Sequence, residues 1–88
     1  MTKEEFYINR AFLYYLLENI ECAIDDYNKL IELNPRNEDY YLNRGYLNHI
    51  SRNRKQALED YDMAIKLKPD YAFAHNNRGV VLAEMGRV

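Results

Sequence analysis

The sequence has few of the residues that interrupt or crosslink a chain. Its 88 residues include one cysteine, three glycines, two prolines and no tryptophan. With Cys22 alone an internal disulfide is excluded, so folding does not depend on an oxidising compartment. The scarcity of glycine and proline, together with 48% apolar residues, favours a folded helical chain over a disordered one. A chain of this length suits one small domain.

Long apolar runs and an excess of charge of one sign are also lacking. No apolar stretch approaches the roughly 20 residues of a membrane helix, and residues 1–6 carry acids where a secretory signal is basic and then apolar. The formal net charge of −2 gives no general attraction to nucleic acid or anionic lipid. The one basic cluster, residues 51–56, falls at an expected turn. We therefore expect a cytoplasmic protein that binds neither membranes nor nucleic acid.

What the chain does have is an internal repeat of 34 residues. A shift by 34 places residues 4–37 over residues 38–71, and twelve of the 34 positions are then identical. A second shift brings Asn-Arg-Gly at 77–79 under Asn-Arg-Gly at 43–45, so the triplet Asn-Arg-Ala/Gly occurs three times in one register. The identical pairs are Glu4/Glu38, Tyr7/Tyr41, Asn9/Asn43, Arg10/Arg44, Leu13/Leu47, Asn19/Asn53, Ala23/Ala57, Asp26/Asp60, Tyr27/Tyr61, Ile31/Ile65, Leu33/Leu67 and Pro35/Pro69.

Each unit has the pattern of two helices. Apolar and aromatic residues recur at spacings of three and four, which places them on one face of a helix. Asn19 suits the turn between the two helices or the cap of the second. Pro35 and Pro69 end the second helices, because proline cannot donate to the helix ladder. The expected helices cover residues 4–17, 20–33, 38–51, 54–67 and 72–85.

Small residues indicate where the two helices of a unit meet. Ala11 and Gly45 on the first helices, with Ala23 and Ala57 on the second, let the backbones approach closely. One hairpin cannot bury its apolar face alone, so we expect the units to stack. Large apolar area around these contacts, with hydroxyls able to reach solvent, comes from Tyr7, Tyr27, Tyr41 and Tyr61.

The pattern resembles the tetratricopeptide repeat (TPR) family, whose 34-residue unit reads W-x2-L-G-x2-Y…A-x3-F…P. The resemblance extends from Glu4 to Val88, and the third copy lacks its second helix. The three copies read Tyr7-x2-Arg10-Ala11-x2-Tyr14…Ala23-x3-Tyr27…Pro35, then Tyr41-x2-Arg44-Gly45-x2-Asn48…Ala57-x3-Tyr61…Pro69, then His75-x2-Arg78-Gly79-x2-Leu82.

The resemblance implies an all-α fold, an α-α superhelix (TPR solenoid) of five helices. Two antiparallel helical hairpins are followed by one terminal helix. Residues 1–88 are then a single TPR domain, with repeat 1 at 4–37, repeat 2 at 38–71 and a partial repeat 3 at 72–88.

The chain departs from the family pattern at two kinds of position. Arg10, Arg44 and Arg78 stand where the family usually has leucine. We expect their guanidinium groups to pair with acids of the second helices, Asp26 or Asp60, while their stems pack on aromatic rings. The turns also carry Glu18 and Arg52 in place of the usual glycine, which leaves the local turn geometry open.

The resemblance further implies a concave groove lined by the first helix of each unit. Asparagine recurs there once per unit and offers both a donor and an acceptor to a peptide backbone, although these amides could equally bond between repeats. The aromatic residues could instead belong to the core. If exposed, they form a patch too large for an inert surface. The residues placed on or near the groove are Asn9, Phe12, Tyr15, Asn43, Tyr46, His49, Phe73 and Asn77.

We therefore expect a protein–protein interaction module that binds an extended peptide or partner helix, with no cofactor, no metal and no enzymatic activity. The only histidines, His49 and His75, have no acid or cysteine beside them at ligand spacing. Some TPR domains hold acidic chaperone tails with Lys, Arg and Asn. Of the positions that match that clamp, only Asn43 agrees, so an apolar or aromatic peptide fits better; the positions are Ile8, Phe12, Asn43, Phe73 and Asn77.

The alternative is a structural or oligomerisation element without a specific groove ligand. Residues 80–88 keep interior-type apolar residues on the side where a sixth helix would lie. The chain is then a fragment of a longer solenoid, or a homodimer through its C-terminal helix that covers Val81, Leu82 and Met85 with a second copy. The remaining alternative is that the fifth helix covers the end of the stack by itself.

Overall fold

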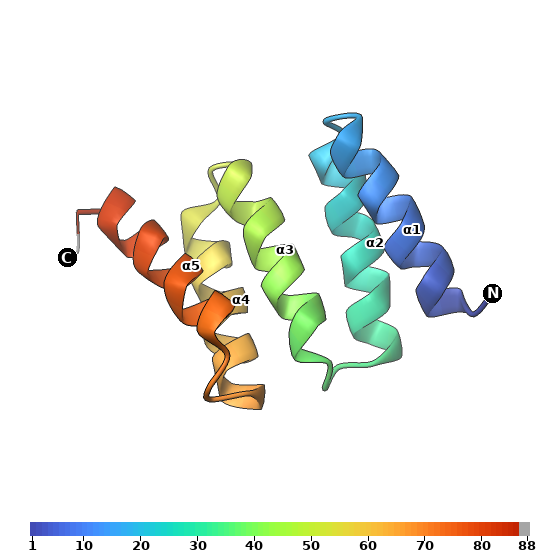
Figure 1. Cartoon of the computed structure of the whole chain (residues 1–88). Coiled ribbons are helices and arrows are strands. Elements are labelled where there is room, and N and C mark those ends of the chain that lie inside the picture. Colours follow the sequence, from blue (N-terminus) through green and yellow to red (C-terminus); the bar gives the residue numbers. More distant parts are fainter. Residues whose placement is uncertain (87–88) are drawn as a thin grey trace.

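The computed structural model describes residues 1–86, which form five α-helices and no strand (Figure 1). Every helix begins and ends within one residue of the expected bounds, and the all-α superhelical fold is confirmed. Residues 87–88, which the expected domain includes, lie outside the described residues. The helices are α1 (Lys3–Leu16), α2 (Ile20–Leu33), α3 (Glu38–Ile50), α4 (Arg54–Leu67) and α5 (Ala72–Glu84).

The helices stack as two antiparallel hairpins, α1–α2 and α3–α4, followed by α5 (Figure 1). In the turn of each hairpin one residue adopts the left-handed conformation, with φ of 62° at Glu18 and 67° at Arg52. A side chain in this region costs about 1 kcal/mol. The turn geometry that glycine would permit is therefore present without glycine. Asn19 then caps α2 by accepting a hydrogen bond from the backbone N–H of Cys22.

The core depends on close approach between the two helices of a hairpin. At Gly45 an added Cβ would lie 2.7 Å from Cε1 of Tyr61, so a larger residue would displace that ring. Ala11 holds the equivalent place in the first hairpin and is fully buried. On the other side of each second helix lies the next first helix, with Leu30 and Leu47 in one apolar cluster between the hairpins.

The outer end of the stack differs from its interior. Leu13 is 56% exposed, whereas Leu47, the equivalent residue one repeat later, is 4% exposed. Phe6 is likewise exposed and its equivalent Tyr40 is buried. The difference arises because α2 packs against this side of α3, while within the described residues no helix covers the same side of α1.

Two expectations for individual side chains are wrong. Val81 does not face outward for a second copy to cover, because it is fully buried in a cluster with Ala57 and Tyr61, and Met85 packs against the same cluster. The hydroxyl of Tyr61 does not reach solvent, since the whole residue is buried. Val81 is one repeat after the buried Leu47 and packs against α4 as Leu47 packs against α2.

The expected arginine–aspartate pairs are confirmed in both hairpins, whereas the expectation for Arg78 is wrong, because it pairs with the exposed Asp62 instead of Asp26 or Asp60. Nη2 of Arg10 lies 2.6 Å from Oδ1 of Asp26, and Nη2 of Arg44 lies 2.7 Å from Oδ1 of Asp60. The buried carboxylate of Asp60 also accepts a hydrogen bond of 3.0 Å from Nδ2 of Asn48. The hydrogen bond to Asp26 raises the pKa of Arg10 above its ordinary value.

The guanidinium groups of Arg10 and Arg44 also lie over aromatic rings. The guanidinium carbon of Arg10 is 5.1 Å from the ring centre of Phe6, and that of Arg44 is 5.8 Å from the ring centre of Tyr41. Each hairpin is thus joined by a charged pair whose carboxylate is buried and whose guanidinium group contacts at least one aromatic ring.

We expect Asp60→Ala to lower the free energy of unfolding by about 3 kcal/mol, because it leaves Arg44 and the buried Asn48 without their shared partner. Urea denaturation followed by circular dichroism measures this change. The matched control is Asp62→Ala, which removes a carboxylate two residues away that is 59% exposed and pairs with Arg78. It should cost less than about 1 kcal/mol. Equal losses in the two variants would contradict the role given to the buried pair.

Candidate functional site

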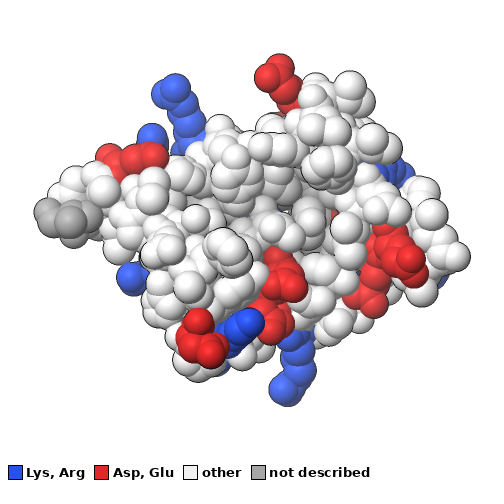
Figure 2. All heavy atoms as spheres, in the orientation of Figure 1, with Lys and Arg blue, Asp and Glu red and all other residues white. Residues whose placement is uncertain are grey.

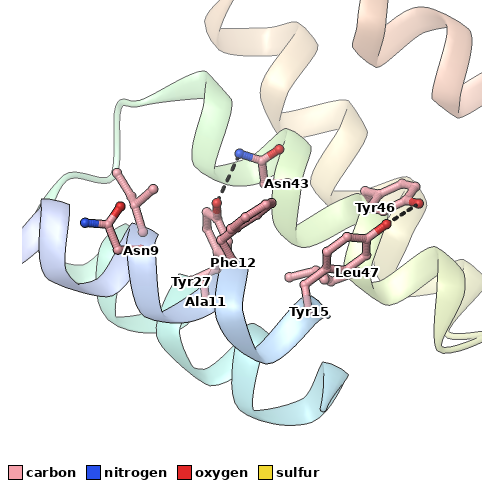
Figure 3. Close-up of a pocket in the computed structure, with 9 residues that line it drawn as sticks. Asn9, Ala11, Phe12, Tyr15, Tyr27, Asn43, Tyr46 and Leu47 are labelled. Carbon is pink, nitrogen blue, oxygen red and sulfur yellow. Dashed lines mark hydrogen bonds between the residues drawn. The ribbon is translucent and has the colours of Figure 1, made fainter. Parts of the chain in front are cut away.

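A groove of about 450 Å³ lies between α1 and α3, with α2 beneath it. Its walls come from the two first helices, and the side chain of Tyr27 from α2 reaches its floor (Figure 3). Five of the eight predicted groove residues are brought together here, and the other four lining residues are apolar or aromatic. The lining residues are Ile8, Asn9, Ala11, Phe12, Tyr15, Tyr27, Asn43, Tyr46 and Leu47.

The groove is uncharged. None of its lining residues is Lys, Arg, Asp or Glu. Figure 2 shows the corresponding face of the molecule, in which the surface over the upper parts of α1 and α3 carries no charged side chain and the charges lie mostly toward the margins. A charged group of a ligand would therefore meet no side chain of opposite charge among the lining residues.

Aromatic side chains remain accessible along its walls. Phe12 is 58% exposed and Tyr46 is 40% exposed, so neither is a core residue. Tyr15 is half-buried, and its hydroxyl lies 3.3 Å from the hydroxyl of Tyr46, which joins α1 to α3 at one end of the groove (Figure 3). This hydrogen bond raises the pKa of Tyr46 above its ordinary value.

The asparagines differ from one another in their surroundings. Asn43 donates from Nδ2 to the hydroxyl of Tyr27 over 3.2 Å, which is a bond between repeats (Figure 3). Asn9 is exposed, and it forms no hydrogen bond with the other labelled residues of the groove (Figure 3). The groove thus presents one exposed amide and one whose carbonyl oxygen is still available.

Three predicted site residues lie outside this groove. Nε2 of His49 is 3.0 Å from both carboxylate oxygens of Glu84 on α5, and Arg54 contacts the same carboxylate. The hydrogen bonds from His49 and Arg54 lower the pKa of Glu84. Phe73 lies exposed against the ring of Tyr71. Asn77, one repeat after Asn43, lies near Tyr61 rather than facing the groove between α1 and α3.

Sequence reasoning missed four lining residues. Ala11 and Tyr27 are expected at the contacts between helices, and Leu47 is a repeated position with no assigned role; all three are buried and also line the groove. Ile8 is expected only at a position of the acidic-tail clamp. The hydrogen bond from Asn43 to Tyr27 spans 16 residues, the same separation as the arginine–aspartate pairs, and this recurring spacing was the available signal.

In the next unit Asn77 and Tyr61 are equivalent to Asn43 and Tyr27, but they do not form the equivalent hydrogen bond. Tyr61 is fully buried, and among the described residues none forms a hydrogen bond with its hydroxyl. Burial raises the pKa of Tyr61 to about 12, and the Asn77 amide lies close enough to oppose that rise without completing the bond. A buried hydroxyl without a partner costs about 1–3 kcal/mol.

We expect Tyr61→Phe to leave the free energy of unfolding unchanged or to raise it by about 1 kcal/mol, because it removes the unpartnered hydroxyl. Tyr27→Phe is the matched control and should lower it by about 1 kcal/mol, because the bond from Asn43 is lost. Urea denaturation of both variants checks the difference. A larger loss from Tyr61→Phe than from Tyr27→Phe would be inconsistent with this assignment.

The raised pKa of Tyr61 gives a second test, the dependence of stability on pH. The pKa of Tyr61 is raised when folded, so its contribution to stability is present below its ordinary value near 10 and declines as pH rises to about 12. Tyr61→Phe should make the unfolding midpoint less sensitive to pH between 10 and 12.

Within residues 1–86 no three His, Cys, Asp or Glu side chains lie close enough together to hold a metal ion. None of the five helices is long and apolar enough to cross a membrane.

Comparison with known families agrees with the fold. A family model described as TPR repeat matches residues 11–49 and 54–86. The chain belongs to the tetratricopeptide repeat family. Comparison with curated proteins finds no match.

Solved structures with this fold superpose closely. The crystal structure of MamA gives a TM-score of 0.90 at 24% identity, over 96% of this chain and 49% of that one. The TPR2B domain of yeast Sti1, in a complex with pHsp70, gives 0.88 at 19% identity, over 94% and 66%. The first TPR of Spaghetti (RPAP3), bound to the HSP90 peptide SRMEEVD, gives 0.88 at 23% identity, over 94% and 66%. The chain thus spans half to two thirds of the length of these neighbours, and the likeness establishes the fold.

Proposed function

We propose that this chain is a protein-interaction module whose groove between α1 and α3 holds an apolar or aromatic side chain of an extended peptide or a partner helix. The observation that carries the proposal is the exposure of Phe12 and Tyr46 on facing walls of an uncharged groove. Covering an exposed aromatic side chain of this size contributes on the order of 2 kcal/mol.

The polar groups of the groove suit the backbone of such a ligand. The exposed amide of Asn9 offers a donor and an acceptor on the α1 wall, and the carbonyl oxygen of Asn43 remains available on the α3 wall. A few polar groups in a mostly apolar site fix the orientation of a ligand. The Tyr15–Tyr46 bridge limits the groove at one end and adds two hydroxyl groups.

The absence of cations from the lining argues against an acidic ligand. The peptide SRMEEVD bound by the Spaghetti domain carries three acidic side chains. Carboxylates are held most strongly by Arg and Lys, whereas Ile8 and Phe12 of this chain occupy positions that the clamp of acidic-tail binders would use. The ligand we propose is therefore different in chemistry, with a large apolar residue as its anchor.

Selection from a displayed library of random peptides tests the proposal. We expect peptides with a conserved aromatic or large aliphatic anchor, and we expect Phe12→Ala to weaken their binding at least tenfold, which is about 1.4 kcal/mol. Fluorescence anisotropy with the selected peptides measures the affinity.

The matched control is Phe73→Ala, which removes an exposed phenylalanine that does not line the groove. It should leave the affinity unchanged. Selected peptides that bind both variants as well as the original chain would refute the groove as the site. Circular dichroism of each variant checks that the helices are retained.

A structural role is the second candidate, favoured by the exposed side of α1. Leu13 and Phe6 present to solvent the surface that Leu47 and Tyr40 bury against α2. Such a surface suits stacking against another helical unit. In this reading the chain is an element of a larger assembly, and the groove has no specific ligand.

Sedimentation velocity over a concentration series separates the two candidates. If stacking through α1 is the function, the chain self-associates, and Leu13→Glu should restore a monomer. Phe73→Glu, at an exposed position of α5, which does not contact α1, is the control and should not. A monomer at all concentrations would count against self-stacking.

A further inference from the structure

A second cleft, of about 470 Å³, lies between α2 and α4, and α3 forms its floor. It exists because α3 packs against both α2 and α4, while the backbones of α2 and α4 do not approach each other closely. The residues of α3 that line it lie on a different face of that helix from those that line the groove. Since the cleft and the groove have no lining residue in common, they are separate sites.

Arg44 spans the floor of this cleft from one wall to the other. Its Nη1 donates to Oδ1 of Asn28 on the α2 side over 3.0 Å, and its Nη2 donates to Oδ1 of Asp60 on the α4 side over 2.7 Å. Asp60 is buried and accepts a further hydrogen bond from Asn48. The charges of Arg44 and Asp60 therefore balance each other, and the floor presents no net charge to a ligand.

Glu59 on the α4 wall is the remaining charged residue that lines the cleft. Its side chain is exposed, and it takes part in none of the ion pairs found within residues 1–86. With the floor neutral, its carboxylate gives the cleft a net negative charge. A cationic group of a ligand is therefore attracted there, and an anionic one is repelled.

The surroundings of Glu59 suit a long basic side chain. Met63, one turn further along α4, is 37% exposed, and the half-buried Ile24 lines the cleft from α2. Gln56, one turn before Glu59, adds an amide oxygen that accepts hydrogen bonds. Lysine and arginine pack their alkyl stems on apolar surface and keep the charged group among polar atoms. An apolar wall beside a carboxylate and an amide matches this division.

The first repeat places a cation in the same column. Shifting by one repeat, Asp25 and Lys29 of α2 take the places of Glu59 and Met63 of α4. In α2 the chain itself thus supplies a basic residue four positions after the acid, a spacing at which opposite charges on a helix attract. In α4 a methionine stands there instead, so the acid faces an open, partly apolar cleft.

We propose that the cleft between α2 and α4 binds a basic side chain, lysine or arginine, of a partner protein. The charged group lies against Glu59 and Gln56, and the stem lies against Met63 and Ile24. The proposal does not depend on the function proposed for the groove between α1 and α3, because the two sites use different residues.

The probes are N-acetyl-lysine methylamide and N-acetyl-arginine methylamide. N-acetyl-norleucine methylamide is the matched control, because it has the stem of lysine without the ammonium group. Each is titrated into the full chain at constant ionic strength, and the amide resonances are followed by NMR. We expect the two basic probes to cause saturable shifts at Ile24, Glu59 and Met63. The norleucine probe should bind about fivefold more weakly, the size expected for loss of a partly exposed ion pair.

Two variants of the chain locate the site. Glu59→Gln should weaken binding of the basic probes about fivefold. Met63→Lys should weaken it roughly tenfold or more, because the new ammonium group meets Glu59 within the helix and occupies the cleft. Both positions are exposed and both new residues favour helix, so the fold is retained. The matched control is Glu32→Gln, which removes the same charge from an exposed position of α2 outside the cleft and should leave binding unchanged.

Three results would overturn the proposal. The first is shifts that do not saturate, and the second is equal affinity for the norleucine probe. The third is an equal loss of binding in Glu59→Gln and Glu32→Gln, which would mean general attraction to a negative surface. Phe12→Ala, which alters only the groove, should leave binding of the basic probes unchanged. If it abolishes their binding, the probes occupy the groove and the cleft is not their site.

Discussion

The structure depends on one repeated interaction, a buried carboxylate of the second helix held by an arginine of the first. Asp26 and Asp60 are almost completely buried, and each would be very costly to bury without its guanidinium partner. Because the pair has fixed geometry, it sets both the distance and the register between the helices of a hairpin. The small residues beside it, Ala11 and Gly45, admit the tyrosine ring that completes the contact.

The groove follows from this register. Once each hairpin is fixed, α2 must lie against α3, and the first helices α1 and α3 stand side by side with α2 beneath them. Side chains that α1 and α3 do not use in the core then face each other across a gap, and here they are aromatic residues and asparagines. The shape of the site is therefore a property of the fold, while its chemistry is specific to this chain.

Much of this could be predicted from the sequence, because the period of 34 residues places equivalent side chains in equivalent surroundings. The helix bounds and the two arginine–aspartate pairs follow from it, and five predicted site residues do meet in one groove. Periodicity fails where the stack ends, since equivalence needs a neighbour on both sides. Leu13 is therefore exposed while Leu47 is buried. Periodicity also does not predict whether a particular hydrogen bond forms. The hydroxyl of Tyr27 accepts one from Asn43, whereas the buried hydroxyl of the equivalent Tyr61 has no partner among the described residues.

The carboxylate of Glu84 joins the ends of three helices. It lies near the C-terminus of α5 and binds both His49 at the end of α3 and Arg54 at the start of α4. If α5 moves away, both contacts break together, and the turn between α3 and α4 loses a restraint. Opening of α5 and fraying of that turn are thus thermodynamically linked, so amide hydrogens in the two segments should exchange with solvent as one cooperative unit.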